Sequence, residues 1–107
     1  MNNTEILKLP KSMEELYLGG PAQLLPDPVI SDEQFGECNF RIYDSVQYGY
    51  AITVSYWQPV RDEWGRMEKW WGMVTAIDAD HHRIKLVNDG GDRWIEVERI
   101  RRVDTLR

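Results

Sequence analysis

Hydrophobic and polar residues alternate along the second half of the chain, in short runs separated by turn-forming residues. In residues 51–57, Ile52, Val54 and Tyr56 alternate with Thr53, Ser55 and Trp57. This alternation, in a run rich in β-branched and aromatic residues, predicts a half-buried β-strand. Four later stretches are also predicted to be strands, at residues 67–78, 83–87, 93–97 and 101–106.

The connections between these strands differ in composition. Residues 58–65 contain Pro59, several charges and Gly65, so we expect a loop there. Residues 88–92 (Asn-Asp-Gly-Gly-Asp) tolerate positive φ and give the strongest turn signal in the chain. Gly72 lies inside the second strand, where a glycine commonly marks a bulge or a sharp bend. Residues 98–100 are compatible with one tight helical turn.

Five short strands with tight turns, one of them bent at Gly72, indicate a small antiparallel barrel over residues 50–106. We therefore predict a mainly β protein, built as a five-stranded SH3-like or Sm-like barrel preceded by one capped helix. A bent strand can serve both sides of such a barrel. A two-layer, half-open sheet is the alternative arrangement.

The helix is predicted at residues 32–48. Ser31 and Gln34 have the spacing of a capping box. Gly49 is suited to ending the helix. Apolar side chains follow at steps of three and four residues, the period of a buried helix face: Phe35, Cys38, Ile42, Tyr43 and Val46. Together with the barrel, this helix forms a single predicted domain over residues 31–107.

Residues 1–30 are predicted to form an attachment to that domain. Residues 1–11 lack periodicity and suggest a mobile arm, and residues 12–15 (Ser-Met-Glu-Glu) form a second capping box. Residues 19–21 (Gly-Gly-Pro) limit that helix to about two turns. Residues 19–30 contain three prolines and should be extended, as a linker or as a strap laid over the barrel by Leu24, Leu25 and Val29.

Composition and charge narrow the possible functions. The 107 residues carry a net charge of −5, which argues against a general nucleic-acid binder. Residues 1–50 hold eight acids and three bases, and residues 51–107 hold ten of each, so the β-domain is neutral. The single cysteine and the absence of a signal peptide or a transmembrane run predict a cytoplasmic protein that does not associate with membranes.

No residue cluster predicts catalysis, so we expect a protein that is not an enzyme and has no cofactor. Cys38 lies on the apolar helix face and is better explained as a buried hydrophobic residue than as a nucleophile. His81 and His82, with Asp78 and Asp80, suit a polar turn better than a metal site, because adjacent histidines seldom reach one ion. Residues 88–92 are too short for a calcium loop.

The five tryptophans make protein binding the leading hypothesis. Trp70 and Trp71 are consecutive on a strand, so one ring must face away from the core. Trp64 lies in the charged loop, where exposed aromatic and arginine side chains suit an anchor and its rim. The acidic N-terminal half supplies further contacts. The candidate protein-binding residues are Trp64, Trp70, Trp71, Arg61, Arg66, Glu14 and Glu15.

A nucleic-acid-binding surface is the alternative hypothesis. Basic residues on neighbouring strands could form one stripe beside Trp94 or Trp57, as on single-stranded nucleic-acid platforms. The members of this stripe are Arg83, Lys85, Arg93, Arg99, Arg101 and Arg102. A solvated face balanced by Glu96, Glu98 and Asp104 is the simpler explanation.

The order of these features resembles the YolD-like family of small bacterial and phage proteins. The resemblance covers residues 9–104, and its motifs are mostly hydrophobic: Leu9-Pro10, Pro28 to Ile30, Ser31 to Gln34, Ile52 to Tyr56, Gly72 to Asp78, Ile84 to Leu86 and Ile95 to Ile100. The loop at residues 58–66 is longer and richer in tryptophan than the family pattern, and the linker at residues 19–26 lacks the continuous charged helix that is usual there. The resemblance implies a small β-barrel protein without catalytic residues. It also implies a place in prophage DNA beside DNA-damage genes, and a role like that of the UmuD accessory subunit of an error-prone DNA polymerase.

The sequence thus predicts a phage-encoded, non-enzymatic adaptor or inhibitor. Its expected partner is a DNA-damage (SOS response) polymerase or a host defence or nuclease protein. The alternative is a single-stranded nucleic-acid-binding module, and a third hypothesis is self-association through the strand edges of the barrel.

Overall fold

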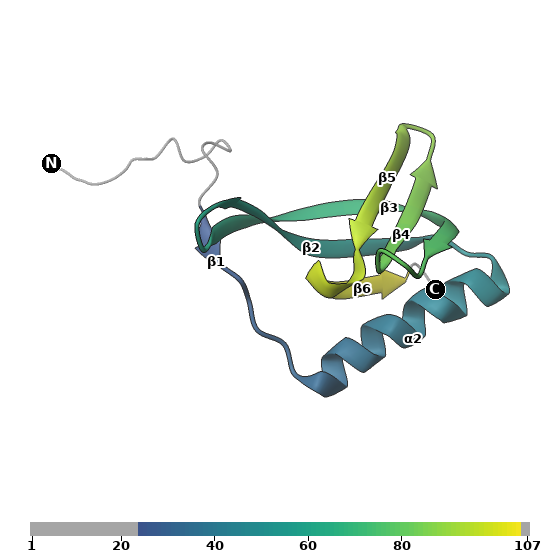
Figure 1. Ribbon diagram of the computed structural model, residues 1–107. Coiled ribbons are helices and arrows are strands. Elements are labelled where there is room, and N and C mark those ends of the chain that lie inside the picture. Colours follow the sequence, from purple (N-terminus) through teal and green to yellow (C-terminus); the bar gives the residue numbers. More distant parts are fainter. Residues whose placement is uncertain (1–23, 106–107) are drawn as a thin grey trace, which may run out of the picture. The chain divides into compact units, whose positions relative to one another are not determined.

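The computed structural model describes residues 24–105. The elements are β1 (Leu25–Pro26), α2 (Asp32–Tyr48), β2 (Ile52–Arg61), β3 (Trp64–Asp78), β4 (Arg83–Asn88), β5 (Gly91–Glu96), the short 3₁₀ helix η1 (Val97–Arg99) and β6 (Ile100–Thr105) (Figure 1). Contacts divide the described residues into two units, one with residues 24–27 and 59–66, the other with residues 28–58 and 67–105. The predicted arm and the predicted short helix that begins at residue 12 and ends before residues 19–21 lie outside the described part of the chain.

Local sequence signals define both ends of α2. The Ser31 hydroxyl accepts a hydrogen bond from the Gln34 backbone N–H at 3.1 Å, and the Gln34 side chain accepts one from the Ser31 N–H at 2.9 Å. This reciprocal pair is the predicted capping box. At the other end, Gly49 adopts a left-handed conformation with φ 68° and donates to the Ser45 carbonyl. The predicted helix at residues 32–48 is therefore confirmed.

The buried face of α2 is narrower than predicted. Cys38, Ile42 and Ser45 are buried, and the Ser45 hydroxyl donates to the Ile42 carbonyl at 2.7 Å. Tyr43 and Val46 were expected in the core, but they are 62% and 44% exposed. The helix packs against the sheet along one line of residues, so the neighbouring apolar side chains remain uncovered.

The strands form one antiparallel sheet with the order β5-β4-β3-β2-β6, and β1 pairs separately with β3. Ten buried residues from α2 and four strands make the core: Cys38, Ile42, Ile52, Val54, Tyr56, Ile84, Leu86, Ile95, Ile100 and Val103. Strands β5 and β6 are the two ends of the order and do not pair with each other. The prediction of a closed barrel was therefore wrong: the chain has one N-terminal helix and then an open antiparallel sheet.

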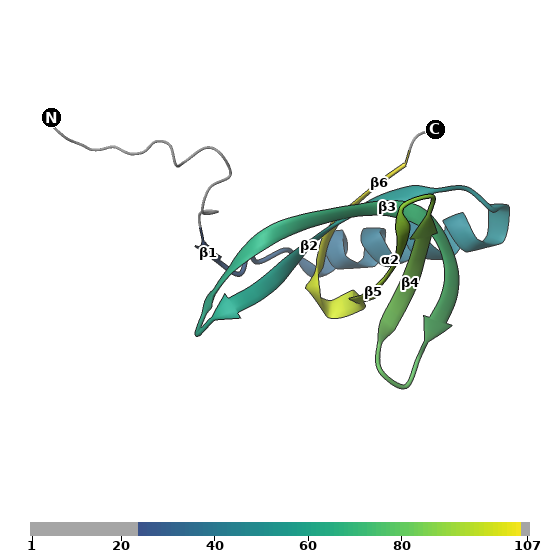
Figure 2. The same ribbon diagram turned by 90° about the horizontal axis from the view of Figure 1, so that it is seen from above.

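Strand β3 is the longest strand and pairs with three other strands. A Cβ atom at Gly72 would lie 2.5 Å from the Val87 carbonyl oxygen, so only glycine allows β3 and β4 to approach this closely. The register of the β3–β4 pair shifts between Val74 and Ala76, as at a β-bulge. Figure 2 shows the β4–β5 hairpin turning away from β2 and β3 at this end of β3.

The prediction of a loop at residues 58–65 was also wrong. Strand β2 continues to Arg61 and β3 begins at Trp64, so only Asp62 and Glu63 form the turn. Asp62 adopts φ 54°, the conformation that glycine usually supplies in such turns. Near this turn, β1 pairs with residues 64 and 65. Val29 is 95% exposed, so it does not act as the predicted strap contact.

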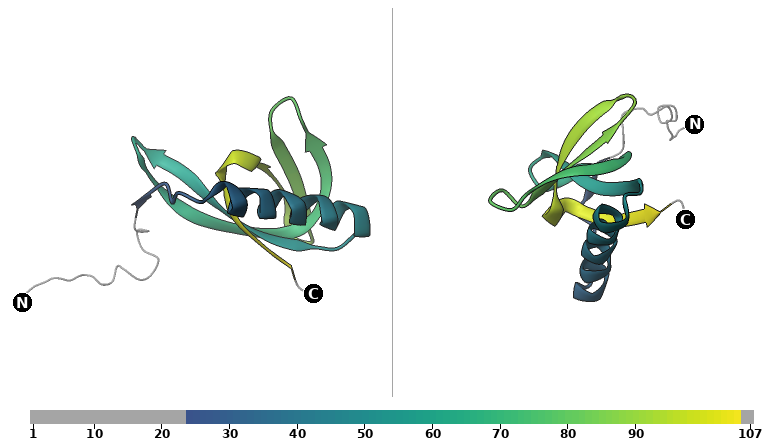
Figure 3. Two further views of the ribbon diagram at one scale, coloured as in Figure 1. Left: turned by 90° about the horizontal axis from the view of Figure 1, so that it is seen from below. Right: turned by 90° about the vertical axis from the view of Figure 1, so that its right-hand side faces the viewer.

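Helix α2 lies alongside β6, the strand at one end of the sheet (Figure 3). The Arg41 guanidinium donates to the Val103 carbonyl at 2.8 Å. The Val103 backbone also lies next to the Cys38 thiol and lowers its pKa, against the larger effect of burial. Arg41 of α2 therefore satisfies a backbone carbonyl on the outer edge of β6, which is one way in which proteins protect an edge strand.

Candidate functional site

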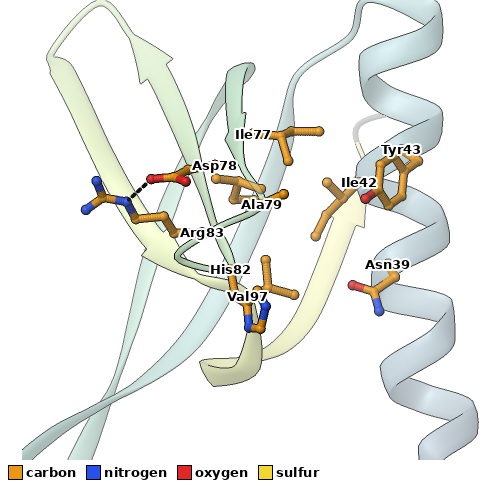
Figure 4. A pocket seen from close by; sticks show the side chains of 10 residues that line it. Asn39, Ile42, Tyr43, Ile77, Asp78, Ala79, His82, Arg83 and Val97 are labelled. Atoms are coloured by element: carbon orange, nitrogen blue, oxygen red, sulfur yellow. Dashed lines mark hydrogen bonds and ion pairs between the residues drawn. The ribbon is translucent and has the colours of Figure 1, made fainter.

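An apolar groove of about 380 Å³ lies between α2 and the adjoining ends of β3 and β4. Ile42 and Tyr43 of α2 form one wall, and Ile77 points toward them from β3 (Figure 4). Ala79, His82 and Val97 line the groove on the side of the sheet. Ile77 is 42% exposed, so its side chain is available at the surface of the groove.

The helix flank beside the groove carries further exposed apolar side chains. Phe40 is 68% exposed, Tyr43 62% and Val46 44%. These residues are three apart, so they lie near one another on α2. We call Phe40, Tyr43, Val46 and the groove beside them the α2 flank.

Polar side chains at the groove are largely paired. The Asp78 carboxylate accepts hydrogen bonds from Arg83 Nε at 3.1 Å and lies 2.9 Å from His81 Nδ1. Partial burial would raise the pKa of Asp78, but the hydrogen bonds from His81 and Arg83 outweigh it and lower the pKa below its ordinary value. His82 lies 3.5 Å from Glu98. The two imidazoles therefore contact different carboxylates.

A second apolar surface lies on the outer side of β3, meaning the face of the strand that points away from the core. Trp71 is 50% exposed, and Met67 and Met73 are each 39% exposed. Because alternate residues of a strand share a face, these three side chains project from the same side of β3. A hollow of about 390 Å³ lies here, lined by Thr53, Lys69, Trp70 and Trp71.

Trp70 and Trp71 have the opposite orientations that a strand requires. Trp70 packs against the core, and its indole N–H donates to the Leu86 carbonyl at 3.2 Å. The Arg93 guanidinium lies 4.4 Å from the centre of the Trp70 ring and donates to the Tyr56 hydroxyl at 2.6 Å. Trp71 is therefore the ring that faces solvent.

The other predicted protein-binding residues lie near the β2–β3 turn or outside the described residues. Trp64 is 48% exposed at the start of β3. Arg61 is exposed at the end of β2, and Arg66 is half-buried in β3. Glu14 and Glu15 belong to residues 1–23, which the structure does not describe.

The six predicted basic residues are separated into several groups. Arg83 and Lys85 approach the Trp94 ring, at 4.4 Å and 5.9 Å from its centre. Arg93 points to the opposite side of the sheet, toward Trp70. Four of the six lie beside acids: Arg83 near Asp78, Lys85 near Asp92, Arg99 near Glu96 and Arg102 near Asp104. Arg101 donates to the Glu98 and Ile100 carbonyls.

A scan against protein-family models matches residues 22–104 to the model described as YolD-like protein. The match covers well over half of the chain. The chain belongs to the YolD-like family. No curated protein and no solved structure matched it in the other two comparisons.

Other features of this YolD-like chain offer little chemistry. Burial raises the pKa of the Cys38 thiol, and the neighbouring Glu37 carboxylate raises it further. Among residues 24–105, no three His, Cys, Asp or Glu side chains gather in a way that would hold a metal ion. None of the helices in this range is both long and apolar enough to cross a membrane.

The groove beside α2 is the feature of this YolD-like protein that sequence reasoning missed. Periodicity assigned Tyr43 and Val46 to the core, because their spacing matches that of Ile42 and Cys38. Phe40 gave the only direct signal, since it is a large apolar side chain at a position that the buried face of α2 does not include.

Proposed function

We propose that this YolD-like protein is a small adaptor or inhibitor that acts by binding another protein and has no enzymatic activity. The observation that carries this proposal is the exposed apolar surface on the outer side of β3. Trp71 stands beside a hollow there, and two methionines extend the apolar surface along the strand. Exposed aromatic and methionine side chains are enriched at protein interfaces, where buried tryptophans contribute much of the binding energy.

Family membership suggests the cellular setting of this activity. We propose a phage or prophage protein that acts in the cytoplasm. Its target would be either a DNA-damage polymerase or a host defence or nuclease protein. Both targets suit a small binding protein that brings no chemistry of its own.

The test is affinity capture of the tagged protein from a bacterial lysate, divided into nuclease-treated and untreated halves. The proposal predicts a partner protein that is retained in both halves. Replacing Trp71 by Ala should reduce its recovery about tenfold or more, because truncation of a tryptophan hot spot typically costs 2 kcal/mol or more. Asp89→Ala, at an exposed position in the β4–β5 turn, is the matched control and should leave recovery unchanged. Equal recovery of the partner by the wild type and by Trp71→Ala would count against this surface as the binding site.

The nucleic-acid alternative has one observation in its favour. Arg83 and Lys85 flank the half-exposed Trp94 ring, an arrangement that could stack a base and contact its phosphate. The same two cations lie beside Asp78 and Asp92, whose charges would repel phosphate. Protein binding is therefore the better-supported function.

A further inference from the structure

We propose that the α2 flank is a docking site for an amphipathic helix of a partner protein, one with apolar residues on one face and lysine or arginine beside them. This inference rests on the proposed protein-binding function and specifies the chemistry of the partner. It also places the contact on α2, away from the outer side of β3.

The first argument is the apolar character of the α2 flank. Phe40 and Tyr43 each expose more than half of their surface, although both are large aromatic side chains. The groove beside Tyr43 has apolar walls from Ile42, Ile77 and Val97 and a volume of about 380 Å³. That volume falls within the usual range for concave binding sites, so it can accept a large apolar side chain.

The second argument is the linear form of the site. From Phe40 to Val46 the flank extends over six residues, or about 9 Å along the axis of α2. Gly36, one turn before Phe40, has nothing within 4 Å of the position of a Cβ atom, so a partner backbone can approach the helix next to the flank. A partner helix of about two turns matches this length, with anchors at positions i, i+4 and i+7. This is the usual way in which an amphipathic helix binds a groove.

The third argument is charge. Helix α2 has four acids, Asp32, Glu33, Glu37 and Asp44, and one base, Arg41, which gives it a net charge of −3. Within residues 24–105, neither Asp32 nor Glu33 nor Asp80, in the turn beside the groove, forms an ion pair. Arg83, the arginine that lines the groove, is held by Asp78. A basic partner would find unpaired carboxylates at the start of α2 and in the turn beside the groove.

The same charges disfavour a second copy of this chain as the occupant. Two α2 helices packed against each other would bring together two segments of net charge −3. The partner is therefore a different protein of opposite charge.

The test measures binding of three synthetic peptides to the full-length protein. The first is an 18-residue peptide of leucine and lysine with its leucines at helical spacing. The second has the same composition in strict alternation, and the third replaces lysine by glutamate. We expect the first peptide to bind at least about tenfold more tightly than the other two. In spectra of the ¹⁵N-labelled protein, it should shift the amides of α2 and of residues 77–84.

Variants locate the site and separate the two proposals. Tyr43→Glu and Ile77→Glu change exposed side chains, so each should weaken peptide binding about tenfold or more and leave the thermal midpoint nearly unchanged. The double variant Glu33→Gln with Asp80→Asn should weaken peptide binding less than these two variants do, and it should reduce the salt dependence of peptide binding. Asp89→Ala, at an exposed position in the β4–β5 turn, is the control and should bind the peptide normally.

Several outcomes would overturn the α2 docking site. One is equal binding of all three peptides, and another is peptide binding that Tyr43→Glu and Ile77→Glu leave unchanged. A third is a shift of the α2 amide signals that depends on protein concentration in the absence of peptide, which would identify a second copy of the chain as the occupant. A partner captured from lysate by the Tyr43→Glu protein but not by Trp71→Ala would also overturn it and leave the proposed function intact. Normal peptide binding with no captured partner would instead contradict the proposed function.

Discussion

At the scale of single residues, two glycines in this chain have opposite roles. Gly72 is required because Val87 leaves no space for a side chain, whereas Gly36 lies in an exposed helix with open space around it. We predict that Gly72→Ala destabilises the protein by about 1–3 kcal/mol, as overpacking typically does. Urea unfolding monitored by tryptophan fluorescence measures this difference.

Gly36→Ala is the control for that experiment. In an exposed helix interior, alanine is favoured over glycine by about 1 kcal/mol, so this variant should be more stable than the wild type. If both alanine variants unfold at the same urea concentration, the close approach of β3 and β4 at Gly72 is not a constraint.

The Asp78 carboxylate predicts a dependence of stability on pH. Its pKa is lowered in the folded protein, so its ionised form favours the folded state. This contribution is complete above the unfolded-state pKa of about 4 and is lost as the pH falls through the lower folded-state value. Asp78→Asn should therefore lower the thermal midpoint at pH 7 and have a smaller effect at pH 3.

Asp89→Asn is the control for Asp78, because Asp89 is an exposed aspartate in the other turn of β4. It should change the thermal midpoint little at either pH. An effect of Asp78→Asn that is the same at pH 3 and pH 7 would contradict the pairing of Asp78 with His81 and Arg83.

At the scale of elements, the contact between α2 and β6 depends on one arginine. Arg41 donates to the Val103 carbonyl and also contacts Glu37 at 2.7 Å. We predict that Arg41→Ala destabilises the protein by about 1–3 kcal/mol, because it leaves a backbone carbonyl without its charged donor. Chemical unfolding of the purified variant provides the measurement.

Arg99→Ala removes an arginine from an ion pair with the half-exposed carboxylate of Glu96. Exposed ion pairs contribute about 0–1 kcal/mol, so this variant should unfold close to the wild type. If the two arginine variants lose similar stability, the Arg41 contact with β6 has no special importance.

Elements with strong local signals were predictable from sequence. The capping box of Ser31 and Gln34 located the start of α2, and Gly49 located its end. The β2–β3 turn was missed because Asp62, and not glycine, adopts its positive φ, and because Pro59 suggested a loop although it lies within β2. Family membership was also predictable, since it depends on the order of such local features.

Features that depend on contacts far apart in sequence were not predictable in the same way. The alternation of Ile52, Val54 and Tyr56 identifies a strand, but it does not indicate whether the last strand pairs with the first or the fourth. Similarly, the spacing of apolar residues in α2 at steps of three and four identifies an apolar helix face, but it does not show how much of this face the sheet covers. The α2 flank therefore emerged only from the structure, whereas the opposite orientations of Trp70 and Trp71 followed from strand geometry alone.

At the scale of the whole molecule, the distribution of charge predicts weak contact with nucleic acid. Four of the six basic residues proposed for that role lie beside carboxylates, and the chain carries −5 overall. We predict no measurable binding of a fluorescently labelled 20-nucleotide single strand at 150 mM salt, by anisotropy. Binding at low salt that weakens steeply with added salt would support the alternative function.

The contact of the Val103 backbone with Arg41 and Cys38 of α2 has a consequence for hydrogen exchange of the Val103 amide. An amide bonded to a neighbouring strand is protected by the sheet, whereas this amide is protected by a helix. Its exchange with deuterated solvent therefore reports how often α2 separates from β6, independently of global unfolding. Comparison of this amide with those of Ile84 and Leu86 in the core would give the free energy of separating α2 from β6 relative to that of opening the core.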